Sequence, residues 1–196
     1  MEAEAIYKLL SETFGDAVSD YTFGGGVKDA FCKVGGERLV EVAKFLRDDP
    51  RTRFDFLQCI TGVDYPRENH LVSVYHLYSY PLRHSFVLKV AVDRAKPLLP
   101  SLTGVWKTAN WQEREAYDLI GLQYTGHPEL RRLLMPDDWD GHPMRKDYQE
   151  KDAYRTMSTQ RYSVMELLSA YDKEHPQTEG ERPRIVVTPD APDEVK

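Results

Sequence analysis

Two histidines, His127 and His142, are the side chains that most resemble a chemical site in this sequence. Each stands between a glycine and a proline, and three aspartates lie between them along the chain. Imidazole and carboxylate groups bind transition metals, so a stand-alone metal-dependent enzyme is one interpretation. The spacing matches no two-histidine metal motif, however. The favoured interpretation is that each proline fixes the backbone and each imidazole hydrogen-bonds a carbonyl of its turn.

A second group of titratable side chains lies just before these histidines, where Glu113, Arg114, Glu115 and Asp118 follow one another. A catalytic carboxylate needs burial or a like-charged neighbour to raise its pKa. Arg114 lies between the glutamates and is placed to pair with Asp118 one turn later. The pattern therefore favours ordinary ionised carboxylates in a structural ion-pair network. That network is expected to extend to one of three later arginines: Arg131, Arg132 or Arg145.

The sequence contains no motif for nucleophilic catalysis or for nucleotide binding. There is no Gly-x-Ser-x-Gly elbow, no dinucleotide-binding fingerprint, and no phosphate loop at the Gly24-Gly25-Gly26 run. The two cysteines, Cys32 and Cys59, stand in apolar contexts and are predicted to be buried free thiols. The basic pairs Arg131-Arg132 and Arg145-Lys146 suit an anion, and ion pairs with a partner protein are their favoured use.

Composition limits the class of protein. The chain has 196 residues, 30% of them charged, and a net charge of -6, which argues against nucleic-acid binding. Its mean hydropathy is -0.58, and no apolar run approaches the length that spans a bilayer. The acidic start of the chain differs from a signal peptide. We therefore expect a cytoplasmic protein that meets a membrane only through a partner.

The pattern of apolar residues predicts an α+β domain. Periods of three and four indicate helices over residues 2–14 and 36–48. Apolar and alternating runs indicate a pair of strands within 16–34 and three more strands further along, joined by turn-rich links. The fold class expected is a two-layer sandwich of a mostly antiparallel sheet with helices on one face, followed by an extended C-terminal tail. The three later strands are 54–63, 71–78 and 86–92.

The pattern of residues changes in the second half of the chain. Residues 101–120 are predicted to be helical in two pieces, with Asn110 capping the second, Glu113 completing a capping box, and Trp111 packing inward. Further along, charge and proline replace apolar periodicity, as in a segment ordered on another protein. We therefore predict a globular domain over residues 1–125 and an extended, turn-rich, partner-wrapping segment over residues 126–196.

Three motifs in this half resemble a known family. Glu113 to Gly121 reads EREAYDLIG, Gly126 to Leu134 reads GHPELRRLL, and Gly141 to Tyr148 reads GHPMRKDY. An upstream segment, Ile60 to Tyr65, resembles the family's strand ending in Asp-Tyr. The order and spacing are similar to those of the hydrophilic thirty-kilodalton-type subunit (the C subunit in bacteria) of respiratory complex I, the proton-translocating NADH:quinone oxidoreductase.

The resemblance implies a noncatalytic subunit of the peripheral arm, in the quinone module, on the cytoplasmic side of the cell membrane. It implies that the chain holds no cofactor and that FMN and iron-sulfur clusters belong to partner subunits. The expected partner is the large, forty-nine-kilodalton-type subunit, over which the C-terminal segment would wrap. Related membrane-bound hydrogenase-type complexes contain an equivalent subunit, so they remain an alternative.

The same resemblance indicates which side chains meet partner subunits. They lie in the three motifs, and no catalytic, cofactor or metal ligand is expected among them. The predicted partner-binding residues are Glu113, Arg114, Glu115, Asp118, His127, Arg131, Arg132, His142, Arg145, Lys146, Asp147 and Tyr148.

Overall fold

The computed structural model describes residues 2–24 and 27–159, together with residues 169, 171 and 173. It divides into two compact units, one over Met1–Glu150 and the other over Lys151–Lys196. The first unit carries the sheet, the helices and all of the predicted site residues. It is therefore the unit in which the predicted site can be described.

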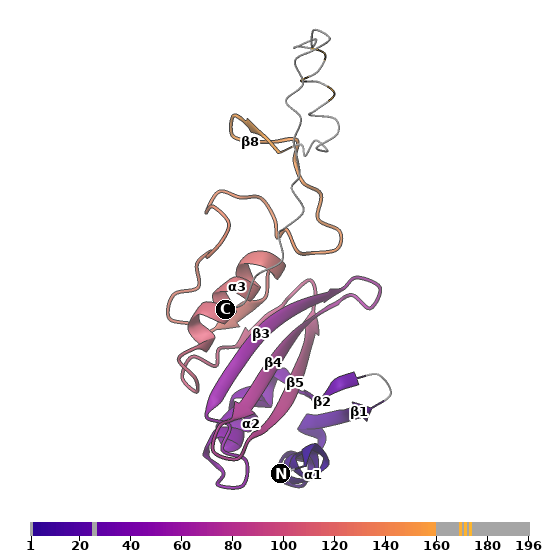
Figure 1. Cartoon of the computed structure of the whole chain (residues 1–196), viewed down its shortest axis with the longest axis vertical. Helices are drawn as coiled ribbons and strands as arrows, with labels where there is room; N and C mark the ends of the chain where they lie inside the picture. The colour runs from indigo at the N-terminus through magenta and orange to yellow at the C-terminus, as the bar shows by residue number, and fades with distance from the viewer. Residues whose placement is uncertain (1, 25–26, 160–168, 170, 172, 174–196) are drawn as a thin grey trace, which may run out of the picture. The chain divides into compact units, whose positions relative to one another are not determined.

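A five-stranded sheet forms the centre of the first unit, in the order β1-β2-β5-β4-β3 (Figure 1). All neighbouring strands are antiparallel except β2 and β5, which are parallel. The prediction of a mostly antiparallel sheet is thus confirmed. The strands are β1 (Val18–Gly24), β2 (Val27–Val34), β3 (Phe56–Tyr65), β4 (His70–Ser79) and β5 (His84–Asp93).

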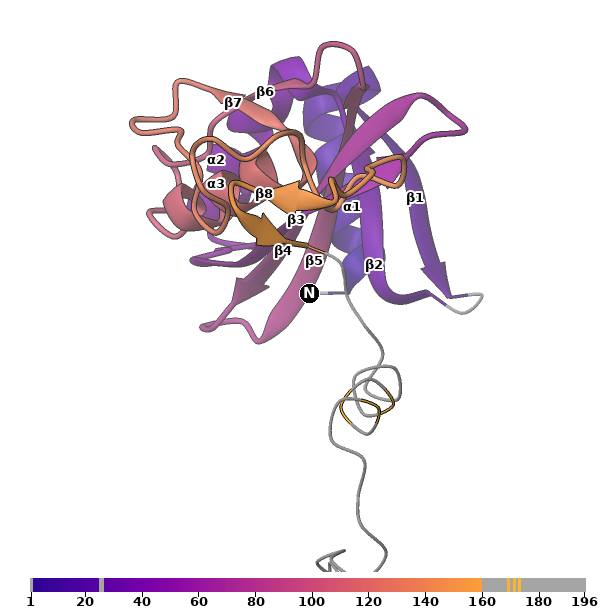
Figure 2. The same cartoon turned by 90° about the horizontal axis from the view of Figure 1, so that it is seen from above.

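Two helices, α1 (Ala3–Phe14) and α2 (Leu39–Asp48), cover one face of this sheet (Figure 2). A short 3-10 turn follows α1 and another precedes α2. The apolar positions predicted for the second helix are all buried, so the periodicity identified its inner face correctly. Those positions are Leu39, Val42, Ala43 and Leu46.

The two faces of the sheet differ, as alternation along a strand requires. In β5, Phe86, Leu88 and Val90 enter the core that the helices cover. On the opposite face, Lys89 places its ammonium 3.3 Å from the centre of the Phe31 ring. The prediction of helices on one face is therefore confirmed.

The third helix, α3 (Ala109–Ile120), packs on the same face, over β3. Gly62 permits the close approach, because a Cβ there would lie 2.9 Å from Cγ1 of Ile120. Short parallel strands flank the helix and pair with each other: β6 (Leu98–Pro100) and β7 (Gln123–Thr125). The predicted helix stop is confirmed at Gly121, whose φ is +86°.

Several details of α3 were predicted wrongly. Residues 101–108 form turns instead of a first helical piece, and the helix is capped by Thr108 without a side-chain hydrogen bond. Asn110 is thus a residue of the helix, and there is no capping box. Trp111 does not pack inward, since its exposed fraction is 62%. The buried face is formed instead by Ala109, Glu113, Ala116 and Ile120.

The division between units differs from the predicted one. Residues 126–150, which were assigned to the C-terminal segment, belong to the first unit, because they are tied to α3 and β3. The second unit contains a small hairpin of β8 (Ala153–Tyr154) and β9 (Met157–Ser158). Residues 160–168, 170, 172 and 174–196 of the predicted segment lie outside the described residues. Within the part of the chain that is described, no helix is long and apolar enough to cross a bilayer.

Candidate functional site

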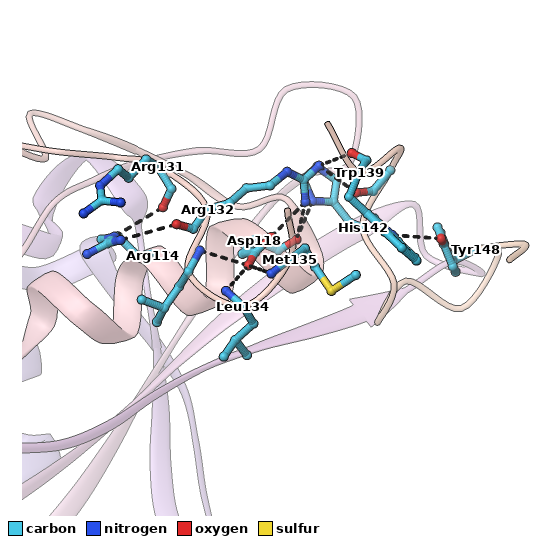
Figure 3. Close-up of polar contacts among 11 residues, drawn as sticks. Arg114, Asp118, Arg131, Arg132, Leu134, Met135, Trp139, His142 and Tyr148 are labelled. Atoms are coloured by element: carbon cyan, nitrogen blue, oxygen red, sulfur yellow. Dashed lines mark hydrogen bonds and ion pairs between the residues drawn. The ribbon is translucent and has the colours of Figure 1, made fainter. Parts of the chain in front are cut away.

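The carboxylate of Asp118 organises the segment that follows α3 (Figure 3). Its Oδ2 accepts hydrogen bonds from the backbone N–H groups of Leu133, Leu134 and Met135 at 3.0, 2.7 and 2.8 Å. Its Oδ1 accepts from Nη1 of Arg132 at 2.8 Å. Burial alone would raise the pKa of Asp118, but these donors together hold it below its ordinary value. The carboxylate is therefore a buried, ionised anchor.

Arg132 extends this anchor to the second Gly-His-Pro turn. Its Nη2 donates to the carbonyl oxygens of Trp139 and Gly141, both at 2.9 Å. The predicted extension of the ion-pair network to Arg132 is confirmed, whereas the predicted pair between Arg114 and Asp118 is wrong. Arg114 instead donates to the carbonyl oxygens of Arg131 and Arg132, at 3.3 Å each (Figure 3).

The second Gly-His-Pro turn caps the C-terminal end of α3. Nδ1 of His142 lies 2.9 Å from the carbonyl oxygen of Asp118, and Nε of Arg145 donates to that of Ile120 at 2.7 Å. Between them, the backbone N–H of Met144 donates to Leu119 O at 3.0 Å. The last carbonyls of a helix lack intrahelical partners and carry partial negative charge, so these donors stabilise the helix end.

Both histidines hydrogen-bond to backbone groups. Burial lowers the pKa of His142, so its imidazole is neutral and its Nδ1–H is the donor to Asp118. Nδ1 of His127 accepts from the N–H of Glu129 at 3.0 Å, which leaves Nε2–H to donate to Asn110 O at 3.1 Å. The predicted carbonyl partners exist, although they belong to α3 and not to the turns. Over the described residues, no group of three or more His, Cys, Asp or Glu side chains is arranged to hold a metal.

A second buried carboxylate, Asp64 at the end of β3, fastens the third motif. Arg94 binds it with both Nε and Nη2, at 2.8 and 3.0 Å, and the N–H of Lys146 donates to it at 2.9 Å. The same guanidinium reaches Asp147 at 2.6 Å. The sequence pattern did not identify Arg94 as a site residue, because an arginine that follows a strand carries no distinctive signal. Asp64 appeared only as part of the Asp-Tyr strand end.

Glu113 is fully buried, contrary to the prediction of an ordinary ionised carboxylate. Burial raises its pKa to about 7, against the bonds that it accepts from Ser101 Oγ at 2.7 Å and Leu102 N at 2.6 Å. The hydroxyl of Tyr124 lies 3.1 Å from that of Ser73 in the same interior. Since the Glu113 carboxyl is enclosed by the chain itself, the raised pKa has a structural cause.

The remaining predicted residues occupy the outside of this network. Glu115 is exposed on α3, and Arg131 pairs with Glu129 at 2.7 Å. Tyr148 accepts a hydrogen bond from Nε1 of Trp139 at 3.0 Å. The structure thus unites the three motifs through α3 and β3. Whether these residues contact a partner stays a prediction.

Cys32 is buried, as predicted, and burial raises the pKa of its thiol to about 12. Cys59 is only half-buried, because it lies on β3 at the edge of the sheet. Both are free thiols. Among residues 2–24 and 27–159, neither thiol lies within a constellation that would activate a nucleophile.

Comparison with known proteins gives one consistent family. The model of "Respiratory-chain NADH dehydrogenase, 30 Kd subunit" matches residues 32–154. The chain is similar to the C subunit of NADH-quinone oxidoreductase from Chlorobium phaeobacteroides, with 42% identity over 78% of this chain and 92% of that protein. It is 56% identical to the corresponding C subunit of a Roseiflexus species over 57% of this chain. The match spans 64% of the Roseiflexus protein, which is less than two thirds of its length.

Solved structures agree with the sequence comparisons. A trypsin-resistant fragment of Nqo5 shares 31% identity at a TM-score of 0.51, over 63% of this chain and 97% of the fragment. A chain of the archaeal membrane-bound sulfane sulfur reductase has a TM-score of 0.63 at 19% identity, over 92% of this chain and 95% of that one. The second likeness is one of fold alone.

Proposed function

Since the chain belongs to the family of the respiratory-chain NADH dehydrogenase 30 Kd subunit, we propose that it is a noncatalytic, quinone-module subunit of a proton-translocating NADH:quinone oxidoreductase. It scaffolds the large, forty-nine-kilodalton-type subunit while electrons pass from NADH to quinone elsewhere in the complex. It binds peripherally, on the cytoplasmic side of the membrane, through the other subunits. The isolated chain has no activity.

One observation carries the proposal: the carboxylates of Asp64 and Asp118 and the guanidinium groups of Arg132 and Arg145 hold the chain itself together. Asp118 and Asp64 are saturated by backbone N–H groups and arginines. His142 caps a helix, and Glu113 is enclosed in the interior. These hydrogen bonds fix the shape of residues 126–148 and leave no poised acid, base or nucleophile in that segment. Such an arrangement suits a docking surface and not a catalytic centre.

The same region presents large apolar side chains to solvent. Trp111 is 62% exposed, Leu134 62% and Met144 59%. Large exposed apolar residues on a rigid, polar-rimmed surface are typical of protein interfaces. They favour a partner that covers α3 and the segment after it. FMN and iron-sulfur clusters are assigned to such partner subunits.

An affinity pull-down of this chain from gently solubilised membranes tests the proposal, with the co-purifying proteins identified by mass spectrometry. We expect recovery of the large quinone-module subunit together with subunits that bear flavin and iron-sulfur clusters. Recovery of a nickel-iron hydrogenase subunit instead would assign the chain to the hydrogenase-type complexes. Recovery of the chain alone, with stoichiometric metal that His142→Ala removes, would contradict the proposal and reopen the metal-dependent enzyme.

A further inference from the structure

A groove of about 700 Å³ lies beside the first turns of α3. Its walls come from residues 103–114 and from the first Gly-His-Pro turn with the residues after it. The hydrogen bond from His127 to Asn110 O holds these walls together. The groove is therefore a fixed feature of the first unit.

A buried cation lies in the wall of this groove. Arg114 is only 3% exposed, yet within the described chain no carboxylate lies within ion-pair distance of its guanidinium. Its hydrogen bonds to carbonyl oxygens are two long ones, at 3.3 Å. A buried charge without a counterion is costly, so the site is electrostatically incomplete.

Further positive charge faces the same space. Lys107 is exposed in the groove and has no carboxylate partner among residues 2–24 and 27–159. Arg131 also lines the groove, and its pair with Glu129 accounts for the single acidic residue there. The N-terminal, positive end of the α3 macrodipole opens beside Lys107. In a chain with a net charge of -6, this is a local excess of positive charge.

An aromatic ring stands at the edge of the groove. Trp111 is 62% exposed, and Cζ of Arg114 lies 4.9 Å from the centre of its ring. Tryptophan and arginine are enriched among the residues that contribute most to protein association. The stacked guanidinium keeps the ring in place, so an apolar side chain can pack on it at small cost in conformational entropy.

We propose that this groove binds an acidic segment of the large partner subunit, with carboxylates at Arg114 and Lys107 and an apolar side chain on Trp111. The inference deepens the proposed function and rests on it for the identity of the partner. The chemistry of that partner follows from the groove itself: an unpaired buried guanidinium, an unpaired ammonium and an exposed indole select an acidic peptide with an apolar anchor.

A zero-length carbodiimide cross-link on the complex isolated from membranes tests the contact directly. The reagent joins an ammonium to a carboxylate only when the two touch. We expect Lys107 to be joined to an aspartate or glutamate of the large subunit. Lys44, exposed on α2, provides the comparison within the same chain. Cross-links of Lys44 to that subunit without any at Lys107 would overturn the inference.

A charge-reversal pair gives an independent test. Lys107→Glu with Arg131→Glu changes exposed side chains and should leave the thermal unfolding of the chain unaltered. We expect about a tenfold lower recovery of the large subunit in the pull-down. The control, Lys44→Glu with Arg67→Glu, makes the same change of charge at exposed positions outside the groove and should recover the wild-type amount.

The outcomes separate the two proposals. If the groove variant and its control recover the large subunit equally well, the acidic docking segment is wrong while the proposed function stands. If the wild-type chain itself recovers no such subunit, the proposed function fails. Trp111→Ala should lower recovery as well, whereas Tyr80→Ala, at an equally exposed ring, should not.

Discussion

The sheet and the segment after α3 are stabilised in different ways. The sheet closes over an interior of apolar side chains, such as Phe54, Leu57 and Leu88, and its backbone groups pair along strands. Residues 126–150 have no such interior of their own. Their backbone groups form hydrogen bonds with the side chains of Asp118, Arg132 and Asp64. Regular structure is thus replaced by buried charge as the means of fixing shape.

This difference has a consequence for function. Apolar packing tolerates exchange of similar side chains, because volume and pattern are what matter. A carboxylate that accepts three N–H groups and one guanidinium permits no substitute, since each donor would lose its partner. The polar residues of the motifs are therefore accounted for by the contacts that hold the second region in place.

The largest effect should come from Asp118→Ala. The substitution leaves the N–H groups of residues 133–135 and the Arg132 guanidinium without their acceptor. We therefore expect a loss of about 3–5 kcal/mol in the free energy of unfolding. Urea unfolding of the purified chain measures it, and Asp137→Ala, at an exposed carboxylate, is the control. Hydrogen exchange should show faster amides in residues 126–150 before those of β4 and β5. Equal acceleration in both would contradict separate stabilisation.

Glu113 should make stability depend on pH. Its pKa is about 7 in the folded chain against 4.5 for an ordinary glutamate, so the folded state binds more protons between these values. The free energy of unfolding should therefore fall as pH rises from 4.5 to 7, by at most about 3 kcal/mol. Glu113→Gln should remove this slope in urea titrations at several pH values, whereas Glu115→Gln should keep it. A slope that persists in Glu113→Gln would assign it to another group.

The cap on α3 can be broken at Gly121. A Cβ there would lie 2.6 Å from both Nη2 of Arg145 and Cδ2 of His142, and φ is +86°. Gly121→Ala should cost about 3 kcal/mol, from strain and displacement of the cap. Gly126→Ala is the matched control, because its φ is +81° but open space surrounds it; strain alone is about 1 kcal/mol. Equal losses in thermal unfolding would show that the cap contributes nothing.

The smallest effect is expected at Asp147, which shares Arg94 with Asp64. The Asp147 side chain is 62% exposed, and solvent screens its ion pair. Asp147→Asn should therefore lower the free energy of unfolding by no more than about 1 kcal/mol, and the difference should vanish at high salt. A larger, salt-resistant loss would mean that this pair belongs to the buried network.

The sequence was sufficient for the sheet and its helices because their signals are local. Periodicity identified the buried side of α2, and Gly121 marked the end of α3. Sequence-based prediction failed where the decisive contact joins residues far apart in the chain. Asp118 hydrogen-bonds to residues fourteen and more positions away. Asp64 accepts a hydrogen bond from Lys146, which is 82 residues away. The false capping box has a similar cause. Trp106 donates to Phe54 O and fixes the preceding turn, so the helix begins at Ala109 and Glu113 is drawn inward.

The long reach of the Asp64 contact also sets an order in time. A chain leaves the ribosome from its N-terminus, so the residues of β3, β4, β5 and then α3 are made before residues 126–150. The acceptors for that segment, which are Asp64, Asp118 and the last carbonyls of α3, are therefore synthesised before their donors. Synthesis that stopped at residue 125 would leave Asp118 without those donors.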